Sequence, residues 1–347
     1  MNEELKDFNP DGVGVVGAGF FGLPCSVANS RVVLISAPWD VTVSYGDGTA
    51  QAPQALMEAS AQLDLYDSSA VDCWREGIAT MPVDEQIAAI SEELRADAQF
   101  VIEALESGAG ESLEVEAARS RVNKGSGVLN EFVYKQAKEL LERGKIVGVV
   151  GGDHSTPYGA IKALGEVYDD FGILHIDAHR DLRVAYEGFE FSHASVMYNV
   201  LRDVEQVSKL VQVGVRDFCD AEQRFADQSE GRVVSFDDLS LARAEFEGEI
   251  WKTTCERIVA ALPKKVYVSF DIDGLEIAYC PHTGTPVSGG LSYNKAVYLL
   301  EQIVASGRTI VGFDVVEVVP AEDDVTDLVV GARMVYKLCG LAIKSSM

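Results

Sequence analysis

The chain has 347 residues, of which 47% are hydrophobic and 24% charged, a balance typical of a globular protein with a full core. Its 29 basic and 55 acidic residues give a net charge of −26, which disfavours binding to nucleic acid or anionic membranes. The six scattered cysteines form no CxxC pair, and the acidic, polar first twelve residues do not resemble a signal peptide. We therefore expect a cytoplasmic protein with reduced thiols and no membrane partner.

Short β-rich apolar runs alternate with helical patterns along the chain. The runs predict buried parallel strands at 31–37, 145–151, 172–177, 210–215, 232–236, 265–271 and 309–316. Helices are predicted, among others, at 84–107, 129–143, 157–168, 293–305 and 322–343. This alternation favours an α/β fold of three layers, with helices on both faces of a mostly parallel, doubly wound sheet of about eight strands.

No low-complexity linker, charge block or internal repeat divides the chain. We expect a single domain over residues 31–347, with residues 1–30 as an N-terminal extension packed on it. Residues 17–22, Gly-Ala-Gly-Phe-Phe-Gly, fit the dinucleotide spacing G-x-G-x-x-G, which requires a strand before it and a helix through it. Pro24 stands where that helix would run, so we interpret the segment as a glycine-rich loop.

Polar side chains follow three of the predicted strands. Six are candidate metal ligands: His154 after the strand 145–151, Asp177, His179 and Asp181 at the end of 172–177, and Asp271 and Asp273 at the end of 265–271. Sites in open α/β sheets form at the carboxyl ends of strands, so all six are expected at one edge. If the extended geometry continues past the strand, residues 177, 179 and 181 also point the same way.

Such a set of side chains is costly to bury without a cation, because its carboxylates repel one another and lose hydration. Imidazoles with a majority of carboxylates suit Mn²⁺, Fe²⁺, Ni²⁺ or Zn²⁺, and the carboxylate excess favours Mn²⁺. Four carboxylates can neutralise two divalent ions, which could share a bridging hydroxide as the nucleophile of a hydrolysis. Singly, each Asp could instead be a helix N-cap, and we interpret His175 as an ordinary core histidine.

The same segments carry a resemblance to a known family. "GGDHS" at 151–155, "DAHRD" at 177–181 and "SFDID" at 269–273 resemble the three metal-binding signatures of the ureohydrolases, which include arginases, agmatinases, formimidoylglutamases and guanidinobutyrases. The likeness covers roughly residues 30–343. It implies an arginase-like fold and a metal-dependent enzyme that hydrolyses a C–N bond of a guanidinium or amidine.

The resemblance also implies roles for single residues. It assigns two Mn²⁺ to three pairs of ligands: His154 and Asp181 on one ion, His179 and Asp273 on the other, and Asp177 and Asp271 bridging. Glu317 matches the carboxylate that holds the substrate guanidinium, and His193 matches a histidine that shuttles a proton. Both are chemically reasonable, since guanidinium pairs bidentately with carboxylate and imidazole titrates near neutral pH. A surface role for Glu317 and a packing or capping role for His193 stay open.

Residues 181–197 are most similar to bacterial and archaeal agmatinases, so we expect agmatine to be cleaved to putrescine and urea. Arg183 stands where arginases place an asparagine that contacts the amino-acid head group. If Arg183 faced the pocket, it would repel an alkylammonium tail and favour the carboxylate of formimidoylglutamate or guanidinobutyrate. Arginine and free guanidine are further alternatives. A non-catalytic family member is disfavoured because all six ligands are present.

Two further features follow from the resemblance. The family usually has Asp-Pro where this chain has Glu276-Ile277, so the loop 274–282 could differ while the metal ligands do not. The resemblance also implies a homotrimer or homohexamer, with a small cationic guanidino compound as the substrate.

Overall fold

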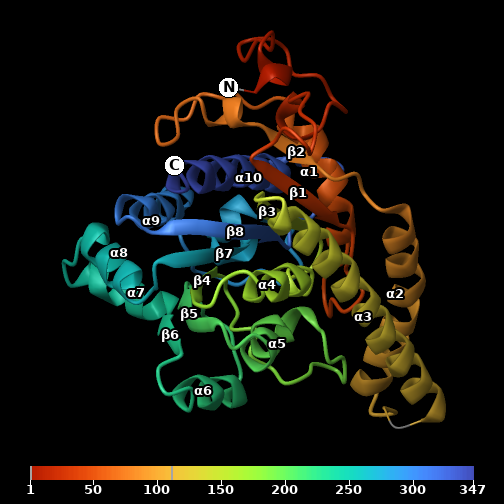
Figure 1. Cartoon of the computed structure of the whole chain (residues 1–347). Helices are drawn as coiled ribbons and strands as arrows, with labels where there is room; N and C mark the ends of the chain where they lie inside the picture. Colours follow the sequence, from red (N-terminus) through yellow and green to blue (C-terminus); the bar gives the residue numbers. More distant parts are fainter. Residues whose placement is uncertain (1, 111) are drawn as a thin grey trace.

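The computed structural model describes residues 2–110 and 112–347, in which eight parallel strands form one central sheet (Figure 1). In space the strands run β2-β1-β3-β8-β7-β4-β5-β6. Their bounds are β1 Val32–Ala37, β2 Ile78–Thr80, β3 Ile146–Gly151, β4 Phe171–Ile176, β5 Val207–Val213, β6 Val233–Phe236, β7 Lys265–Asp271 and β8 Thr309–Val316. Helices cover both faces, so the predicted three-layer α/β class is confirmed.

Two hydrophobic clusters, one on each face of the sheet, hold the layers together. The first packs under α1 Ala52–Ser60, α7 Asp238–Phe246, α8 Trp251–Ala260, α9 Tyr293–Ala305 and α10 Thr326–Ser345. The second packs under α2 Glu85–Glu106, α3 Leu113–Glu142, α4 Tyr158–Gly165, α5 Val196–Asp203 and α6 Asp220–Asp227. Alternate residues of a strand enter opposite clusters, as Leu174 and Ile173 of β4 do. Interior strands are therefore apolar at most positions on both faces.

Helix α3 is much longer than the predicted helix at 129–143. It begins after Ser112, whose hydroxyl accepts a hydrogen bond from the Val115 N–H at 3.2 Å. Gly125 lets α2 approach closely, because a Cβ at that position would lie 2.0 Å from a methyl carbon of Leu94. Glycines at 125 and 127 weaken the helical pattern, so the sequence signal begins only after them.

The shortest strand was not predicted, and one strand begins earlier than expected. Strand β2 has only three residues at the edge of the sheet, too few to show a period. Strand β5 starts at Val207 rather than at residue 210. These differences lie away from the edge where the candidate ligands gather.

The N-terminal segment contacts the rest of the chain through aromatic side chains. Phe20 and Phe21 are buried, and the Phe21 ring meets Tyr336 of α10 edge to face at 4.9 Å. Residues 17–22 form turns and a short 3₁₀ helix, Phe20–Gly22, with no strand before them, which supports the interpretation as a loop. The boundary at residue 30 stays a prediction. Among the described residues, no helix has the length and apolar character needed to cross a membrane.

Candidate metal centre and substrate pocket

Four adjacent strands in the middle of the sheet, β3, β8, β7 and β4, carry the predicted site at their carboxyl ends. His154 follows β3, Asp177 follows β4, and Asp271 is the last residue of β7. Glu317 follows β8, which lies between β3 and β7. Neighbouring strands are about 4.8 Å apart, so side chains from all four ends can meet.

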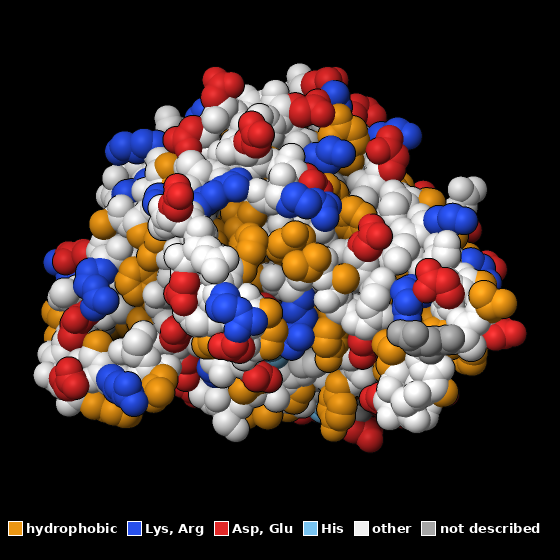
Figure 2. All heavy atoms as spheres, turned by 90° about the horizontal axis from the view of Figure 1, so that it is seen from below, with side chains coloured by type: hydrophobic (Ala, Val, Ile, Leu, Met, Phe, Trp, Pro, Cys, Tyr) orange, Lys and Arg blue, Asp and Glu red, His pale blue; other side chains and the backbone are white. Residues whose placement is uncertain are grey.

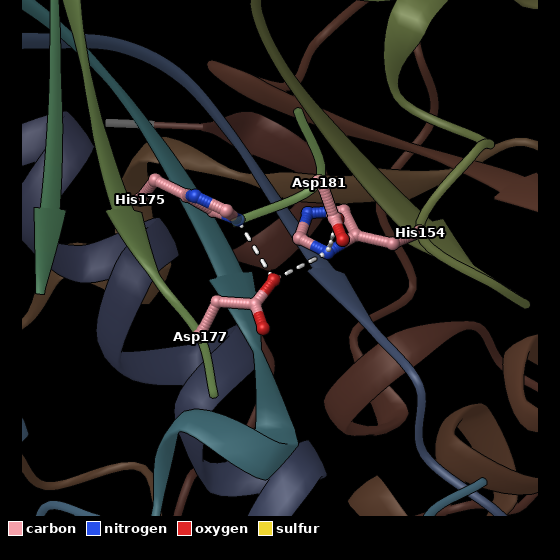
Figure 3. A group of neighbouring side chains, drawn as sticks. All are labelled: His154, His175, Asp177 and Asp181. Carbon is pink, nitrogen blue, oxygen red and sulfur yellow. Dashed lines mark hydrogen bonds and ion pairs between the residues drawn. The ribbon is translucent and has the colours of Figure 1, made fainter. Parts of the chain in front are cut away.

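The imidazole of His154 is the centre of the first group of candidate ligands. Its Nδ1 atom lies 3.0 Å from Asp177 Oδ2, 3.1 Å from Asp181 Oδ2 and 3.1 Å from Asp271 Oδ2. Figure 3 shows the first two of these carboxylates directed at the same imidazole nitrogen. All four side chains are at most 5% exposed. We call these four residues the buried half of the centre.

The orientation of His154 is fixed from behind by a serine of β7. His154 Nε2 lies 2.9 Å from Ser269 Oγ, and this hydroxyl donates to Asp314 Oδ1 at 3.1 Å. Because the serine proton is used on Asp314, the Ser269 oxygen accepts a hydrogen bond from the Nε2–H of His154. Nδ1, the nitrogen that faces the carboxylates, is therefore the one left to bind a metal, which is the arrangement that a metal-ligating histidine requires.

His179 forms the second group, which we call the open half. Its Nδ1 atom lies 3.1 Å from Asp273 Oδ2 and 3.4 Å from Asp177 Oδ1. Asp273 is held by the Ala178 N–H, which donates to its Oδ1 at 3.0 Å. The His179 side chain is 24% exposed. Asp177 thus presents one oxygen to each half of the centre.

A turn, rather than an extended strand, brings Asp181 to the centre. Strand β4 ends at Ile176, and Asp181 has a φ of 55°, in the left-handed region. Asp177 stabilises the turn, since its Oδ1 accepts the His179 N–H at 2.5 Å. The expectation that residues 177, 179 and 181 share a face of a continuing strand is therefore wrong, although all three reach the predicted place.

The centre has the properties of a cation site. His154 Nδ1, Asp181 Oδ2 and Asp273 Oδ2 are buried atoms without a hydrogen-bond partner in the described structure. Burial, and then the charge of Asp273, raises the pKa of Asp271 well above its ordinary value. Burial alone would also raise the pKa of Asp177, but His175 and His154 hold it well below that value. Divalent cations would satisfy these atoms and neutralise the carboxylates.

Glu317 is held against the buried half. It has a φ of 61°, its N–H donates to the Gly152 carbonyl at 2.9 Å, and its Oε1 accepts the His154 N–H at 2.8 Å. Burial raises its pKa well above the ordinary value, and the nearby Asp153 adds to this. A buried carboxylate of this kind is a receptor for a cation such as guanidinium.

Two loops meet over Glu317. The Gly46 N–H donates to the Gly284 carbonyl at 3.2 Å, and a Cβ on Gly284 would lie 2.9 Å from the Gly46 carbonyl oxygen and 3.7 Å from Glu317 Oε2. Arg216 holds the second loop from below, since its Nη2 donates to the carbonyls of Asp273 at 2.6 Å and Val287 at 3.0 Å. The loops are thereby fixed relative to the open half of the centre.

His193 lies at the side of the centre, at the start of a short 3₁₀ helix, His193–Ser195. Its N–H donates to Thr42 Oγ1 at 3.2 Å, and its ring meets Tyr186 edge to face at 6.0 Å. Burial, followed by the charges of His179 and His154, lowers the pKa of His193 to about 3. The imidazole is therefore neutral at physiological pH.

A cavity of about 410 Å³ leads to the centre. His179, Asp181 and His193 line it, whereas Glu317 and the remaining candidate ligands do not. The other lining residues are Ser44, Tyr45, Arg183, Tyr186, Ala194, Asp217, Phe218, Glu222, Thr285, Pro286 and Val287. The substrate is thus expected to meet the open half first.

The Arg183 side chain is directed along the wall of the cavity. The side chain lines the cavity, but its Nε lies 3.7 Å from Glu222 Oε2 and its guanidinium stacks on the Tyr186 ring at 4.6 Å. Glu222 is itself fixed by the Leu182 and Cys219 N–H groups. The charge of Arg183 is therefore compensated within the wall.

Several residues of the site were missed by reasoning from the sequence. Asp217 lines the cavity, and its carboxylate has no ion pair or hydrogen bond within the described parts of the chain. His175 is buried as predicted, yet its Nε2 lies 2.7 Å from Asp177 Oδ2. The period of two along β4 places residues 175 and 177 on one face, and this signal could have linked them. Asp217 follows a strand that was not assigned to the site.

Comparison with known proteins agrees with this geometry. The sequence model of the arginase family matches residues 30–340 of this chain. An N(1)-aminopropylagmatine ureohydrolase of Thermus thermophilus is 31% identical over 312 residues, 90% of each chain, and an agmatinase of Bacillus anthracis is 28% identical over 302 residues, 86% of this chain and 87% of the other.

A crystal structure of an agmatine ureohydrolase of Thermoplasma volcanium shares the fold. Its TM-score is 0.68 over 92% of both chains, at 22% identity. The match of a family model to most of the chain, together with a relative above 30% identity, is sufficient to assign the family. The chain belongs to the arginase family of ureohydrolases.

Proposed function

We propose that this ureohydrolase cleaves agmatine to putrescine and urea, with two divalent cations, preferably Mn²⁺, at the centre. The observation that carries the choice of substrate is the charge of the cavity wall. Glu222 compensates Arg183, whereas the carboxylate of Asp217 stays uncompensated among the described residues. The wall therefore favours a cationic tail over the carboxylate of formimidoylglutamate or guanidinobutyrate.

The ligand sets support two ions. The buried half offers His154 and Asp181, the open half offers His179 and Asp273, and Asp177 faces both. Asp271 contacts His154, and its role as a second bridge rests on the family resemblance. When bound, two divalent ions supply Lewis acidity and lower the pKa of a water molecule that serves as the nucleophile.

The residues of the chain would then act around the guanidinium. Glu317 holds the guanidinium by charge-assisted hydrogen bonds and orients its carbon towards the ligand groups. Neutral His193 accepts a proton from the nucleophilic water and delivers it to the departing amine. Asp181 combines two roles, because it is a candidate ligand and also lines the cavity that the substrate enters.

N(1)-aminopropylagmatine is a second candidate substrate. The relative at 31% identity carries that name, and a cavity of about 410 Å³ has room for a tail longer than that of agmatine. A longer tail carries an additional amine, which the carboxylate of Asp217 could bind. The two substrates share the guanidinium chemistry and differ only along the cavity wall.

A substrate screen with Mn²⁺-loaded protein tests the proposal. Agmatine, N(1)-aminopropylagmatine, arginine, guanidinobutyrate and formimidoylglutamate would be compared by kcat/KM from urea or product release. The amine-tailed compounds should be preferred, and Asp217→Asn should lower kcat/KM for them by about tenfold. If a carboxylate-tailed compound were the better substrate and Arg183→Ala removed that preference, the assignment of an amine-tailed substrate would be wrong.

The identity of the metal, the assembly and the compartment are also part of the proposal. Elemental analysis of purified protein distinguishes Mn²⁺ from Ni²⁺, Fe²⁺ or Zn²⁺. We propose a homotrimer or homohexamer, which light scattering would test, and a cytoplasmic enzyme of polyamine synthesis. Figure 2 shows acidic and basic side chains interspersed on one face of the described chain, without the broad basic field that nucleic acid would need.

A further inference from the structure

A buried polar network adjoins Asp177 beside His154, whose ring lies 5.1 Å from that of His175. His175, two residues earlier on β4, is 0% exposed, and its Nε2 lies 2.7 Å from Asp177 Oδ2 (Figure 3). An ionised carboxylate can only accept, so Nε2 carries the proton and donates it to Asp177. The same carboxylate oxygen faces His154 Nδ1 at 3.0 Å.

Gln212 of β5 fixes the protonation of His175. Its Nε2 lies 3.0 Å from His175 Nδ1, and an amide nitrogen can only donate, so Nδ1 must be the acceptor. Both ring nitrogens are therefore used within the protein. His175 is unable to serve as a metal ligand while this network is intact.

Arg180 in turn fixes the amide of Gln212. Its Nη1 donates to Gln212 Oε1 at 3.1 Å, and its carbonyl accepts the Gln212 amide at 2.8 Å, so an exchange of the amide oxygen and nitrogen would break both contacts. The Arg180 side chain is only 1% exposed. Its other amino group donates to Gln223 and Asp237, and its guanidinium lies over the Phe218 ring at 4.1 Å.

Burying an arginine and a histidine costs free energy of desolvation, which their hydrogen bonds must offset. Their position next to Asp177 therefore indicates a role in holding that carboxylate. Arg180 stands between His179 and Asp181 in sequence, so the turn that carries these candidate ligands is tied to β5 through the same side chain. The network thus connects the orientation of Asp177 to the turn after β4 and to the neighbouring strand.

We propose that His175, held in one tautomer by Gln212 and Arg180, is a positioning residue that orients Asp177 between the two halves of the centre. The inference rests on the proposed function, because it gives Asp177 the role of shared metal ligand. The donated proton fixes the carboxylate plane, so that Oδ2 faces His154 while Oδ1 faces His179. Partners of this kind typically change metal affinity by about 10- to 100-fold.

The test compares His175→Leu, which removes the donor, with His175→Gln, whose amide nitrogen can still donate to Asp177. Metal affinity would be measured by competition with a chelator, without substrate, and kcat and KM at saturating Mn²⁺. We expect His175→Leu to weaken metal binding by about 10- to 100-fold and to lower kcat more than it raises KM. His175→Gln should recover most of the loss.

Gln212→Met provides a second variant in case His175→Leu does not fold. It keeps His175 but frees its tautomer, so an intermediate loss of metal affinity is expected. Ile173→Val, on the same strand and the same face, is the matched control for a small core change and should bind metal as the wild type does.

The possible results distinguish the positioning role of His175 from the proposed metal-dependent function. If His175→Leu binds both ions with wild-type affinity, or if His175→Gln is as weak as His175→Leu, the positioning role is overturned while the ureohydrolase assignment stands. If the wild-type protein itself binds no divalent ion, the metal-dependent function fails, and the role of His175 fails with it.

Discussion

The two halves of the candidate centre share one carboxylate but are built differently. In the buried half, His154 is 2% exposed and its ring is fixed through Ser269 to Asp314. In the open half, His179 is 24% exposed and lines the cavity. His154 is thus part of the protein core, whereas His179 is part of the pocket wall.

This difference follows from where the ligands sit in the chain. His154 and Asp271 come directly from the ends of β3 and β7, whose backbones are held in the sheet. His179 lies in the turn after β4, whose backbone is held by hydrogen bonds to other segments, such as Ala178 N–H to Asp273 Oδ1, rather than within a strand of the sheet. We infer that the buried half retains its cation strongly, while the open half meets solvent and substrate.

Removal of the shared carboxylate should have the largest effect. Asp177→Asn keeps the shape of the side chain but takes a charge from both halves, so kcat should fall by about 10³-fold or more. Elemental analysis after Mn²⁺ loading and desalting should give clearly less than the two equivalents expected for the wild type. A variant that retained both ions would show that the halves do not depend on Asp177.

A substitution at Glu317 should affect catalysis while leaving both halves in place. Glu317→Gln keeps an oxygen for the His154 N–H but loses the charge that we propose holds the guanidinium, so turnover should fall by about 10²-fold. The metal content should remain that of the wild type, as measured on the same preparation. A loss of metal would mean that Glu317 supports the buried half rather than the substrate.

Metal removal should distinguish the halves directly. Under a chelator, one equivalent should leave rapidly from the open half and the second slowly from the buried half, because His179 is 24% exposed whereas no ligand of the buried half is more than 5% exposed. His179→Asn should abolish the rapid phase, whereas His154→Asn should abolish the slow one. A single phase for both ions would contradict the division into two halves.

The pH dependence of stability gives the smallest expected effect. Burial alone would lower the pKa of His154, but the carboxylates of Asp177, Asp181 and Asp271 raise it well above the ordinary value in the metal-free protein. His179 behaves in the same way, because Asp273 and Asp177 outweigh burial.

A raised histidine pKa stabilises the fold below about pH 6.5, and this stabilisation is lost as the pH rises through the folded-state value. The metal-free protein should therefore lose stability with rising pH while the loaded protein does not. Calorimetry should show the difference in Tm between the two widening by a few degrees above neutrality. A constant difference would argue against proton displacement by the metal.

Much of the fold was predictable, because buried parallel strands are apolar at most positions on both faces and seven of the eight produce a clear run. The three residues of β2 produce none. Gly125, which allows the close approach of Leu94, weakens the helical pattern in the first half of α3. The six candidate ligands could be identified from the sequence because each lies at or just after the end of an apolar strand, where sites in α/β sheets form.

The remaining parts of the site depend on contacts between segments that are distant in sequence. The direction of Arg183 is set by Glu222, 39 positions later, and the role of His175 by Gln212 on another strand. Asp181 reached its expected place through a left-handed turn that no local pattern announces for an aspartate. Sequence patterns identify chemical groups, but their orientation is a property of the assembled fold.

The backbone contact between Gly46 and Gly284 allows the loops beside the cavity to change in evolution independently of the candidate metal centre. The loops that contain Gly46 and Gly284 contact each other through backbone atoms rather than through side chains. The residues next to these glycines line the cavity. Neighbouring positions, such as Tyr45 and Thr285, can therefore vary the aperture and its chemistry without disturbing the strands that carry the ligands. Substitutions in these two loops would therefore change the preference among amine-tailed substrates, while the candidate metal ligands stayed the same.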